Sequence, residues 1–576
     1  MAPLNLEKRG KVAASEPYYD LGKHSMPTST KSQDAQTWFD RGLIWVYSFN
    51  HNEAAACFAQ ATLHDQDFAL AHWGVAFSSG PNYNKVWQAF DHVDLQESLR
   101  KCYDYSRKAK ELSSSATAVE QALIEALQHR FPSRDEIPAS FTPSVQAYAD
   151  AMRNVYKRFG TDDLDIITLS ADALMNTAPW GLYEARTGKP NLATPVLEVS
   201  EILENGLAKP EAKYHPGILH MYIHLVEMSK TPERATKAAD YLRDLVPEGG
   251  HMCHMPSHID VLIGDYRRAL HSNLKASIAD DKYYAINGGN NFYSFYRMHN
   301  YHSLIYAAML AGQSEAALEA VSRMEATITD EMLLMKSPPM VDWLEFFKSV
   351  RVHALIRFGK WEELKALPIS NQKDLHCVTI AMTFYGKGVA YAATGDIDNA
   401  IRQRDLFREA AERVPPTRLI FPNKVVKLLK IASAMLDGEL EYRRGNFDVA
   451  FKSLRLAIEL DDALIYAEPW AWMMPTRHPY AALLLEQGRV EEAAAVYAED
   501  LGLNENLAGA HQHPNNVWAL HGYHECLLRL GRKAEASLIK KQLAVAEAGA
   551  DIVISSSCFC RLRTANTDEV PSRCCI

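Results

Sequence analysis

The feature that most constrains the fold of this chain is a pattern that recurs seven times between about residues 262 and 540. Each copy has an apolar stretch with helical periodicity, one glycine, and a charged stretch that contains small apolar residues. Glycine adopts the left-handed conformation that ends a helix, and alanine lets the next helix pack closely. The copies are LIGDYRRAL at Gly264, LAGQSEAAL at Gly312, RFGKWEEL at Gly359, ATGDIDNAI at Gly395, RRGNFDVAF at Gly445, EQGRVEEAA at Gly488 and RLGRKAEAS at Gly531.

The spacing of these glycines predicts a repeat protein. Successive glycines lie 48, 47, 36, 50, 43 and 43 residues apart, and a unit without the glycine spans Gly42 to Phe77, with Asn50-His51 at its turn. The pattern resembles the tetratricopeptide repeat (TPR) family, whose unit has about 34 residues. We therefore expect an all-α, TPR-like α-solenoid of degenerate helix-turn-helix repeats, whose longer units could close around a central pocket.

Composition sets the expected domain boundaries. Residues 1–34 are polar and contain several prolines, so we expect a disordered segment there, followed by the solenoid over 35–545. Residues 546–576 contain four of the nine cysteines, Cys558, Cys560, Cys574 and Cys575, and are expected to form a flexible tail. A run at 179–195 is expected to be a long loop, and a long loop that interrupts a repeat array usually has a function.

Charge and hydropathy exclude several classes of partner. A formal net charge of −10 gives no attraction to nucleic acid or to anionic membranes. We found no apolar run long enough to span a bilayer and no apolar core of a signal peptide at the N-terminus. The expected location is the cytoplasm, with the five scattered cysteines reduced.

Histidine is concentrated in the middle of the chain. Nine of the 22 histidines lie between His215 and His302. His220, His224 and Glu227 stand at i, i+4 and i+7, and so share one face of a helix. His254 and His258 are also four apart, although Pro256 is expected to distort or restart that helix. Imidazole is the commonest ligand of transition metals in proteins, so the predicted metal ligands are His220, His224, Glu227, His254, His258 and His302.

A second resemblance concerns these same stretches. HMYIHLVEMS, HMPSHIDVLIGDY, MHNYHSLIYAAMLAG, AHWGVAF, GPNYN and EPWAWMMPTRHPY are together similar to a family of long TPR-type proteins of bacteria and fungi. The resemblance extends over most of the chain and implies that the histidines form a site. Members of that family have mostly unassigned roles, so it implies no reaction. His251 and Cys253 are less typical of the pattern and rank below His254 and His258.

Two structural explanations of the cluster remain open at this point. The six ligands could hold one metal or two metals that share the carboxylate, with copper or iron favoured and zinc as the other option. Alternatively, the histidines could cap helices and form hydrogen bonds across repeat interfaces. Aromatic residues crowd the same stretch, and the predicted substrate-binding residues are Trp180, Tyr222, Tyr293, Tyr296 and Arg297.

These features predict one main function and two alternatives. The main prediction is a transition-metal-dependent enzyme, an oxidoreductase acting on a small aromatic or carbonyl-bearing metabolite. The first alternative is a TPR-type protein-interaction adaptor with a structural histidine cluster, which could bind a protein partner through the solenoid surface. The second is a zinc-dependent hydrolase or lyase.

Overall fold

The computed structural model describes residues 10–561, and α-helices account for most of them. The helices of the first half are α1 (Gln33–Tyr47), α2 (His51–His64), α3 (Ala69–Ser79), α4 (His92–Leu112), α5 (Ala118–Arg130), α6 (Thr142–Phe159), α7 (Leu164–Met175), α8 (Val196–Leu207), α9 (Pro216–Val226), α10 (Thr236–Leu242), α11 (Gly250–His254), α12 (Pro256–Leu262) and α13 (Tyr266–Asn287). Those of the second half are α14 (Tyr293–Leu310), α15 (Ser314–Glu325), α16 (Asp330–Leu333), α17 (Met340–Leu344), α18 (Val350–Arg357), α19 (Trp361–Ala366), α20 (Cys377–Ala393), α21 (Ile397–Glu412), α22 (Val425–Arg443), α23 (Phe447–Asp462), α24 (Arg477–Glu486), α25 (Val490–Asp500), α26 (Val517–Arg529) and α27 (Lys533–Glu547).

Short elements complete the chain. The 3-10 helices are η2 (Trp87–Ala89), η3 (Ser113–Ser115), η4 (Pro210–Tyr214), η5 (Pro232–Ala235), η6 (Glu345–Ser349) and η7 (Gly509–His511). Two strands, β1 (Leu419–Ile420) and β2 (Asn423–Lys424), form an antiparallel hairpin in which Leu419 pairs with Lys424 and Ile420 with Asn423. This hairpin could not be predicted from sequence, because strands of two residues are too short to show alternation.

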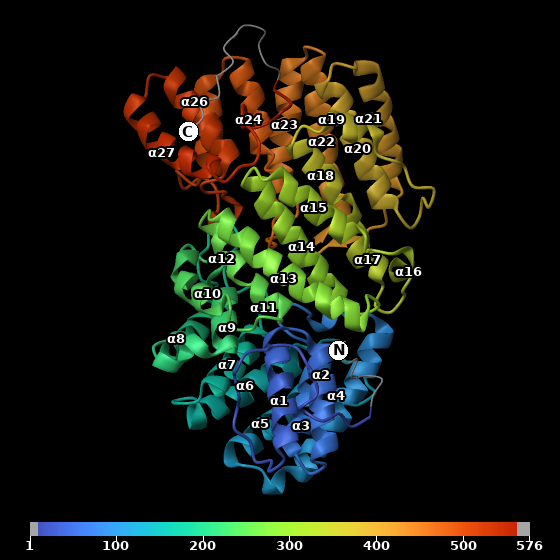
Figure 1. Ribbon diagram of the computed structural model, residues 1–576, viewed down its shortest axis with the longest axis vertical. Helices are drawn as coiled ribbons and strands as arrows, with labels where there is room; N and C mark the ends of the chain where they lie inside the picture. Colours follow the sequence, from blue (N-terminus) through green and yellow to red (C-terminus); the bar gives the residue numbers. More distant parts are fainter. Residues whose placement is uncertain (1–9, 562–576) are drawn as a thin grey trace.

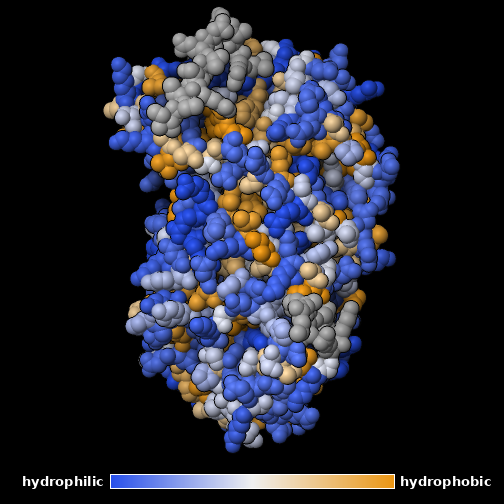
Figure 2. Space-filling view, in the orientation of Figure 1, coloured by the Kyte–Doolittle hydropathy of each residue, from blue (hydrophilic) through white to orange (hydrophobic). Residues whose placement is uncertain are grey.

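The helices form an elongated stack of antiparallel pairs (Figure 1). Helices α1–α6 lie at one end, α18–α27 at the other, and α9–α15 between them. Polar residues cover most of the face in Figure 2, with apolar patches along its middle. No helix among residues 10–561 is long and apolar enough to cross a membrane.

The seven repeated glycines all end a helix in the left-handed region. Their φ angles lie between 62° at Gly359 and 85° at Gly395, and each stands in the turn of a helix pair, such as α24/α25 at Gly488. The predicted reason for glycine at these turns is therefore confirmed, and with it the predicted all-α, TPR-like solenoid. The unit at Gly42–Phe77 also forms, with the side chain of Asn50 capping α2 by accepting a hydrogen bond from the Glu53 amide.

The N-terminal segment differs from the prediction of disorder for residues 1–34. Residues 10–32 lack regular structure, but they lie against α1 and α2 and bury Val12, Tyr19 and Leu21. The Val12 carbonyl accepts a hydrogen bond from the Trp38 indole at 2.9 Å. Backbone groups paired in this way order a segment without any secondary structure, which is why its polar composition was misleading. Residues 1–9 lie outside the described part.

The described part of the predicted C-terminal tail, residues 546–561, is also ordered. Residues 549–561 form an irregular segment with several turns between the helix pairs, and Cys558 and Cys560 are buried there and joined by a disulfide. The Asp551 carboxylate caps the N-terminus of α15 by accepting hydrogen bonds from the amides of Ser314 and Glu315 at 2.7 and 2.8 Å. Cys574 and Cys575 lie outside the described residues.

A buried carboxylate holds the N-terminal segment in place. Asp165 Oδ1 accepts hydrogen bonds from His24 at 2.9 Å, His215 at 3.0 Å and the Tyr47 hydroxyl at 2.7 Å. Burial raises the pKa of Asp165, but the two histidines lower it more, and the net pKa is below its usual value. Burial lowers the pKa of His24, but Asp165 outweighs it, and the net pKa of His24 is raised.

These two opposite shifts predict a pH window for residues 10–28. The stabilisation from Asp165 is lost as pH falls below about 4, and that from His24 is lost as pH rises through its raised pKa, above about 6.5. Hydrogen exchange of residues 10–28, corrected for intrinsic rates, should therefore be slowest between about pH 4 and 6.5. Asp165→Asn should abolish this pH dependence. If exchange of residues 10–28 is still slowest between about pH 4 and 6.5 in the variant, other groups cause the dependence.

Candidate functional site

The histidine cluster lies in the middle of the solenoid, where α9, α11, α12 and α14 meet (Figure 1). His220 and His224 lie on one face of α9, as predicted, with ring centroids 4.8 Å apart. His220 Nδ1 lies 2.6 Å from the Tyr47 carbonyl oxygen, and His224 Nδ1 lies 2.7 Å from Glu227 Oε1. Because both acceptors require a proton on Nδ1, both Nε2 atoms carry a lone pair. Neither Nε2 has a hydrogen-bond partner among the described residues, although both are buried.

His251 completes a first group of three. It begins α11, and its two ring nitrogens are buried without a hydrogen-bond partner in residues 10–561. One nitrogen from each of His220, His224 and His251 lies within 4.8 Å of the others. We call these residues the first triad. The sequence ranked His251 below His254 and His258, and the structure places it beside His220 and His224.

His254, His258 and His299 form the second triad. His254 Nε2 lies 2.7 Å from His258 Nε2 and 2.9 Å from His299 Nε2. Pro256 starts α12 after α11 ends, as the sequence predicted, and this break leaves His254 and His258 facing each other. His299 projects from the neighbouring α14.

Glu227 joins the two triads. It follows α9 directly; Oε1 accepts from His224 Nδ1, and Oε2 accepts from His258 Nδ1 at 2.7 Å and from the Tyr466 hydroxyl at 3.2 Å. Its carboxylate thus orients one imidazole of each triad by its Nδ1 atom, in the manner of the carboxylates behind histidine ligands in metal sites. The hydrogen-bonded geometry favours an orienting role for Glu227. Its predicted role as a metal ligand stays a prediction.

Burial governs the protonation of the cluster. It lowers the pKa of His224 to about 3 and that of His254 to about 4. The pKa of His220, His251 and His258 lies well below the usual value, first because of burial and then because of the neighbouring histidines. Burial also raises the pKa of Glu227 well above its usual value. The imidazoles are therefore neutral near pH 7, and their lone pairs are available to a ligand.

Two strained aromatic residues cover the first triad. Phe49 and Trp180 are two of the three non-glycine residues with positive φ in the described chain, at 54° and 59°. The Phe49 ring stacks on His224 and His251, and the Trp180 ring meets His224 edge-on at 5.5 Å. Backbone strain of this kind persists where the surrounding structure requires it, and it is concentrated at functional sites. Trp180 lies in the predicted loop at 179–195, which the structure confirms between α7 and α8.

The remaining predicted residues are divided between the site and other contacts. Tyr296 contacts His251 edge-on at 5.3 Å, whereas the Tyr293 hydroxyl donates to Asp280 at 2.9 Å. The Tyr222 hydroxyl faces Glu204, away from the cluster, and Arg297 forms an ion pair with Asp281. The predicted ligand His302 packs on Phe347, one helical turn from His299, and belongs to neither triad.

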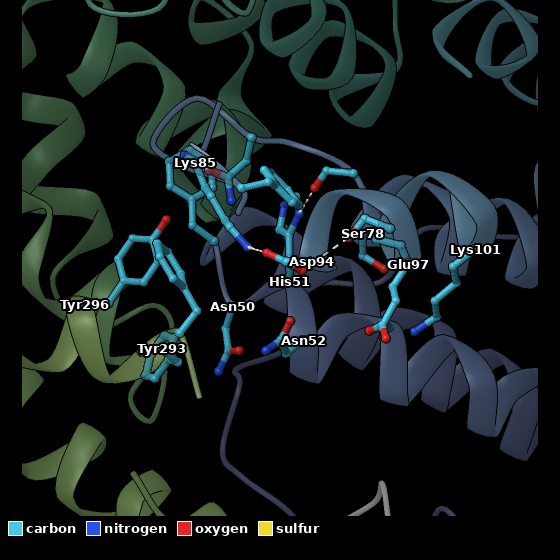
Figure 3. Close-up of a pocket in the computed structure, with 18 residues that line it drawn as sticks. Asn50, His51, Asn52, Ser78, Lys85, Asp94, Glu97, Lys101, Tyr293 and Tyr296 are labelled. Atoms are coloured by element: carbon cyan, nitrogen blue, oxygen red, sulfur yellow. Dashed lines mark hydrogen bonds and ion pairs between the residues drawn. The ribbon is translucent and has the colours of Figure 1, made fainter. Parts of the chain in front are cut away.

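A cavity of about 240 Å³ lies behind Phe49 and Tyr296 (Figure 3). Asn50, His51 and Asn52 enter it from α2 and the turn before it, and Tyr293 and Tyr296 from α14. Lys85 is paired there with Asp94 at 2.7 Å. Phe49 and Tyr296 therefore form the wall between this polar cavity and the first triad. A smaller cavity, of about 40 Å³, reaches His299 from the side of Trp180 and Tyr466.

The similarity of this chain to known proteins is distant. No protein-family model matches the chain, and no curated protein matches it in sequence. Several solved structures do match in fold. The Cut9–Hcn1 hetero-tetramer of the APC/C shares 13% identity over 83% of this chain and 74% of the matched chain, with a TM-score of 0.29. The Naa15/Naa10 complex bound to HypK-THB shares 14% identity over 89% and 70%, with a TM-score of 0.23. The TPR domain of P58(IPK) shares 11% identity over 71% and 99%, with a TM-score of 0.16.

The helix pairs of this chain and the left-handed glycines at their turns form a TPR-like solenoid. The same comparisons correct the predicted function. Two of the matched structures were solved with protein partners, and the similarity of this chain to them is one of fold alone. The main prediction, a metal-dependent oxidoreductase of a small metabolite, is not supported by these comparisons and is replaced by the first alternative, a protein-interaction adaptor. Catalytic activity of any other kind stays a prediction, as does the predicted transition-metal cofactor.

Proposed function

We propose that this TPR-like solenoid is a protein-interaction adaptor that binds an extended peptide segment of a partner protein. The observation that carries this proposal is an open groove of about 640 Å³ between the central and C-terminal helix pairs. The groove is formed by the start of α13, the end of α14, the residues before α26 and the last turns of α27 (Figure 1). Helical repeats commonly bind peptides in grooves of this kind.

The lining of the groove indicates the chemistry of the peptide. Its apolar surface comes from residues such as Leu310, Val517 and Val545, and Arg267 and Lys541 add positive charge at its edge. Val545 is 69% exposed and is therefore open to contact with a partner. An extended segment with apolar and acidic side chains would complement this surface.

The chain itself supplies an example of how an extended segment is held. Residues 549–561 begin at the end of this groove, where Gln313 donates to the Gly549 carbonyl oxygen at 2.9 Å. Farther along, Arg357 donates to the Ser557 carbonyl oxygen at 3.3 Å, and Arg561 forms an ion pair with Glu525 at 2.6 Å. These contacts to backbone carbonyls and to one charged side chain are of the kind that a bound peptide would make.

We also propose that this adaptor acts in the cytoplasm, as the sequence predicted. The five cysteines of the body are free thiols in the described residues, and all are buried. Free thiols are typical of proteins in a reducing compartment.

Site-specific photocrosslinking tests the proposed groove. A photoreactive residue at Val545 should crosslink to a partner polypeptide in cells, whereas one at Leu197, which is similarly exposed on α8, should not. Charge reversal at the rim, Arg267→Glu with Lys541→Glu, should reduce the Val545 crosslink about tenfold, because it removes the electrostatic complementarity to an acidic segment. Equal crosslinking at Val545 and Leu197 would contradict the groove as the binding site.

A further inference from the structure

We propose that the two histidine triads are two adjacent metal sites, each of which binds one transition-metal dication through imidazole nitrogens. This inference goes beyond the adaptor function and rests on different residues. It also differs from the ligand set predicted from the sequence, because it includes His251 and His299 and assigns Glu227 an orienting role.

The first triad has the composition of a three-histidine metal site. The Nδ1 atoms of His220 and His224 are occupied by the Tyr47 carbonyl and by Glu227, so both Nε2 atoms present lone pairs. These atoms and the nitrogens of His251 are buried and have no hydrogen-bond partner in the described part of the chain. A buried polar atom without a partner costs about 1–3 kcal/mol in free energy, and a shared cation would satisfy all three rings at once.

The second triad has an arrangement that neutral imidazoles cannot satisfy alone. His254 Nδ1 must donate to Asn273 Oδ1, because the Asn273 amide nitrogen donates to the Ala269 carbonyl oxygen and thereby fixes the orientation of the amide. His258 Nδ1 donates to Glu227 Oε2. The two Nε2 atoms, 2.7 Å apart, are therefore both acceptors, and two lone pairs at this distance repel each other. A cation between them turns the repulsion into two bonds.

The distances suit a metal after small movements. Bonds of about 2.0–2.1 Å at tetrahedral angles place ligand nitrogens roughly 3.3 Å apart. The nitrogens of the second triad, at 2.7 and 2.9 Å, need to separate by a few tenths of an ångström. Those of the first triad lie within 4.8 Å and need to approach. Rotation of the histidine side chains supplies both movements.

Charge supports the same assignment. Glu227 is 1% exposed, and its hydrogen-bond and ion-pair partners within residues 10–561 are two imidazoles and a phenol, with no lysine or arginine. A buried carboxylate needs a compensating positive charge to stay ionised, and without one burial raises its pKa, as it does for Glu227. Two dications next to it would supply that charge through the imidazoles that it orients.

The group of His24, Asp165 and His215 shows what a satisfied histidine–carboxylate cluster looks like. His24 and His215 both donate to Asp165, which also accepts from Tyr47. In that group the carboxylate lies between the rings, and hydrogen bonds use the facing atoms. In the triads the free nitrogens face one another, and the carboxylate lies behind them. The two triads therefore have the arrangement of metal ligands, and the Asp165 group does not.

The donor set defines the class of metal. Three imidazole nitrogens with no carboxylate or thiolate among the ligands suit zinc, copper or iron, and disfavour magnesium and calcium. Each site would leave at least one coordination position for water or a small ligand.

Elemental analysis of the full-length protein tests the proposal. The protein as purified, or after removal of metal and titration with Zn²⁺ or Co²⁺ alone, should hold two equivalents per chain, and bound Co²⁺ should show the visible absorption of a low-coordinate site. His220→Ala/His224→Ala and His254→Ala/His299→Ala should each reduce the content to one equivalent. His302→Ala is the matched control, because His302 is equally buried and has an unpartnered Nε2 but lies outside both triads.

Each possible result of this experiment either supports or contradicts the two metal sites. Two equivalents in the wild type and in His302→Ala, with one in each double variant, would support the two sites. Substoichiometric metal in the wild type after titration would overturn the proposal, whatever the variants do. Two equivalents in a folded triad variant would overturn the assigned ligands. Loss of metal in His302→Ala would favour the ligand set predicted from the sequence. The photocrosslink at Val545 does not depend on any of these results, so failure of one proposal leaves the other standing.

Discussion

Alanine at Gly264 should destabilise the protein much more than alanine at Gly488, although both glycines end a helix of a repeat. Their φ angles are similar, 78° and 72°, so the strain of a side chain in the left-handed region should cost about 1–2 kcal/mol at either position. At Gly488 nothing lies within 4 Å of the position that a Cβ would occupy. At Gly264 a Cβ would lie 2.2 Å from the Pro514 carbonyl oxygen, which belongs to the backbone and cannot rotate away.

The extra cost at Gly264 follows from this contact. A shift of the residues before α26 should add about 1–3 kcal/mol to the strain, for a total loss of about 3–5 kcal/mol in the free energy of unfolding. Urea unfolding, followed by circular dichroism, measures the difference between the two variants. Since Gly264 also lines the proposed groove, its variant should lose the Val545 crosslink, whereas Gly488→Ala should keep it. Equal losses of stability in the two variants would mean that the Pro514 backbone moves freely.

The repeated turns could be predicted from sequence because the information is local. A left-handed residue after a helix and small residues at the start of the next helix are requirements of a single turn, and glycine and alanine meet them. The tertiary neighbours of Gly264 and Gly488 differ completely, but the pattern is the same at both. The sequence therefore predicted the helix pairs, and it could not predict which glycines touch other parts of the chain.

Local sequence patterns could predict only part of the histidine cluster. Helical periodicity placed His220 with His224, and both do lie on one face of α9. On α14, the choice between His299 and His302 depends on how the helix is rotated about its axis against α11 and α12, and neighbouring packing sets that rotation. His251 was ranked low because it is less typical of the family pattern, yet the fold brings it to α9.

The predictions of disorder for the two terminal segments were wrong for another reason. Residues 10–32 have the polar composition of a disordered chain, and neither they nor residues 549–561 form a helix that periodicity could reveal. Single hydrogen bonds from distant residues order them, such as those of Trp38 to Val12 and of Arg357 to Ser557. Such contacts leave no periodic trace in the sequence.

Replacement of Glu227 by alanine should have the second large effect. The carboxylate accepts hydrogen bonds from His224, His258 and Tyr466 in a buried environment. Its removal leaves three buried donors without an acceptor, so Glu227→Ala should lower the free energy of unfolding of the metal-free protein by about 3–5 kcal/mol. Urea unfolding after treatment with a chelator measures this loss separately from any stabilisation by bound metal.

Glu227→Gln separates this structural effect from the orientation of the triads. Glutamine keeps the shape and one acceptor oxygen, so it should cost less stability than alanine. Its amide NH₂ must face one of the two imidazoles, His224 or His258, whose Nδ1 then has to accept a hydrogen bond. That imidazole carries its proton on Nε2 and cannot bind a metal with that atom. The metal content should therefore fall from two equivalents to one, while His302→Ala stays at two. If Glu227→Gln keeps two equivalents of metal, Glu227 does not set the tautomers of the triads. Its role is then limited to filling the space between them and accepting hydrogen bonds.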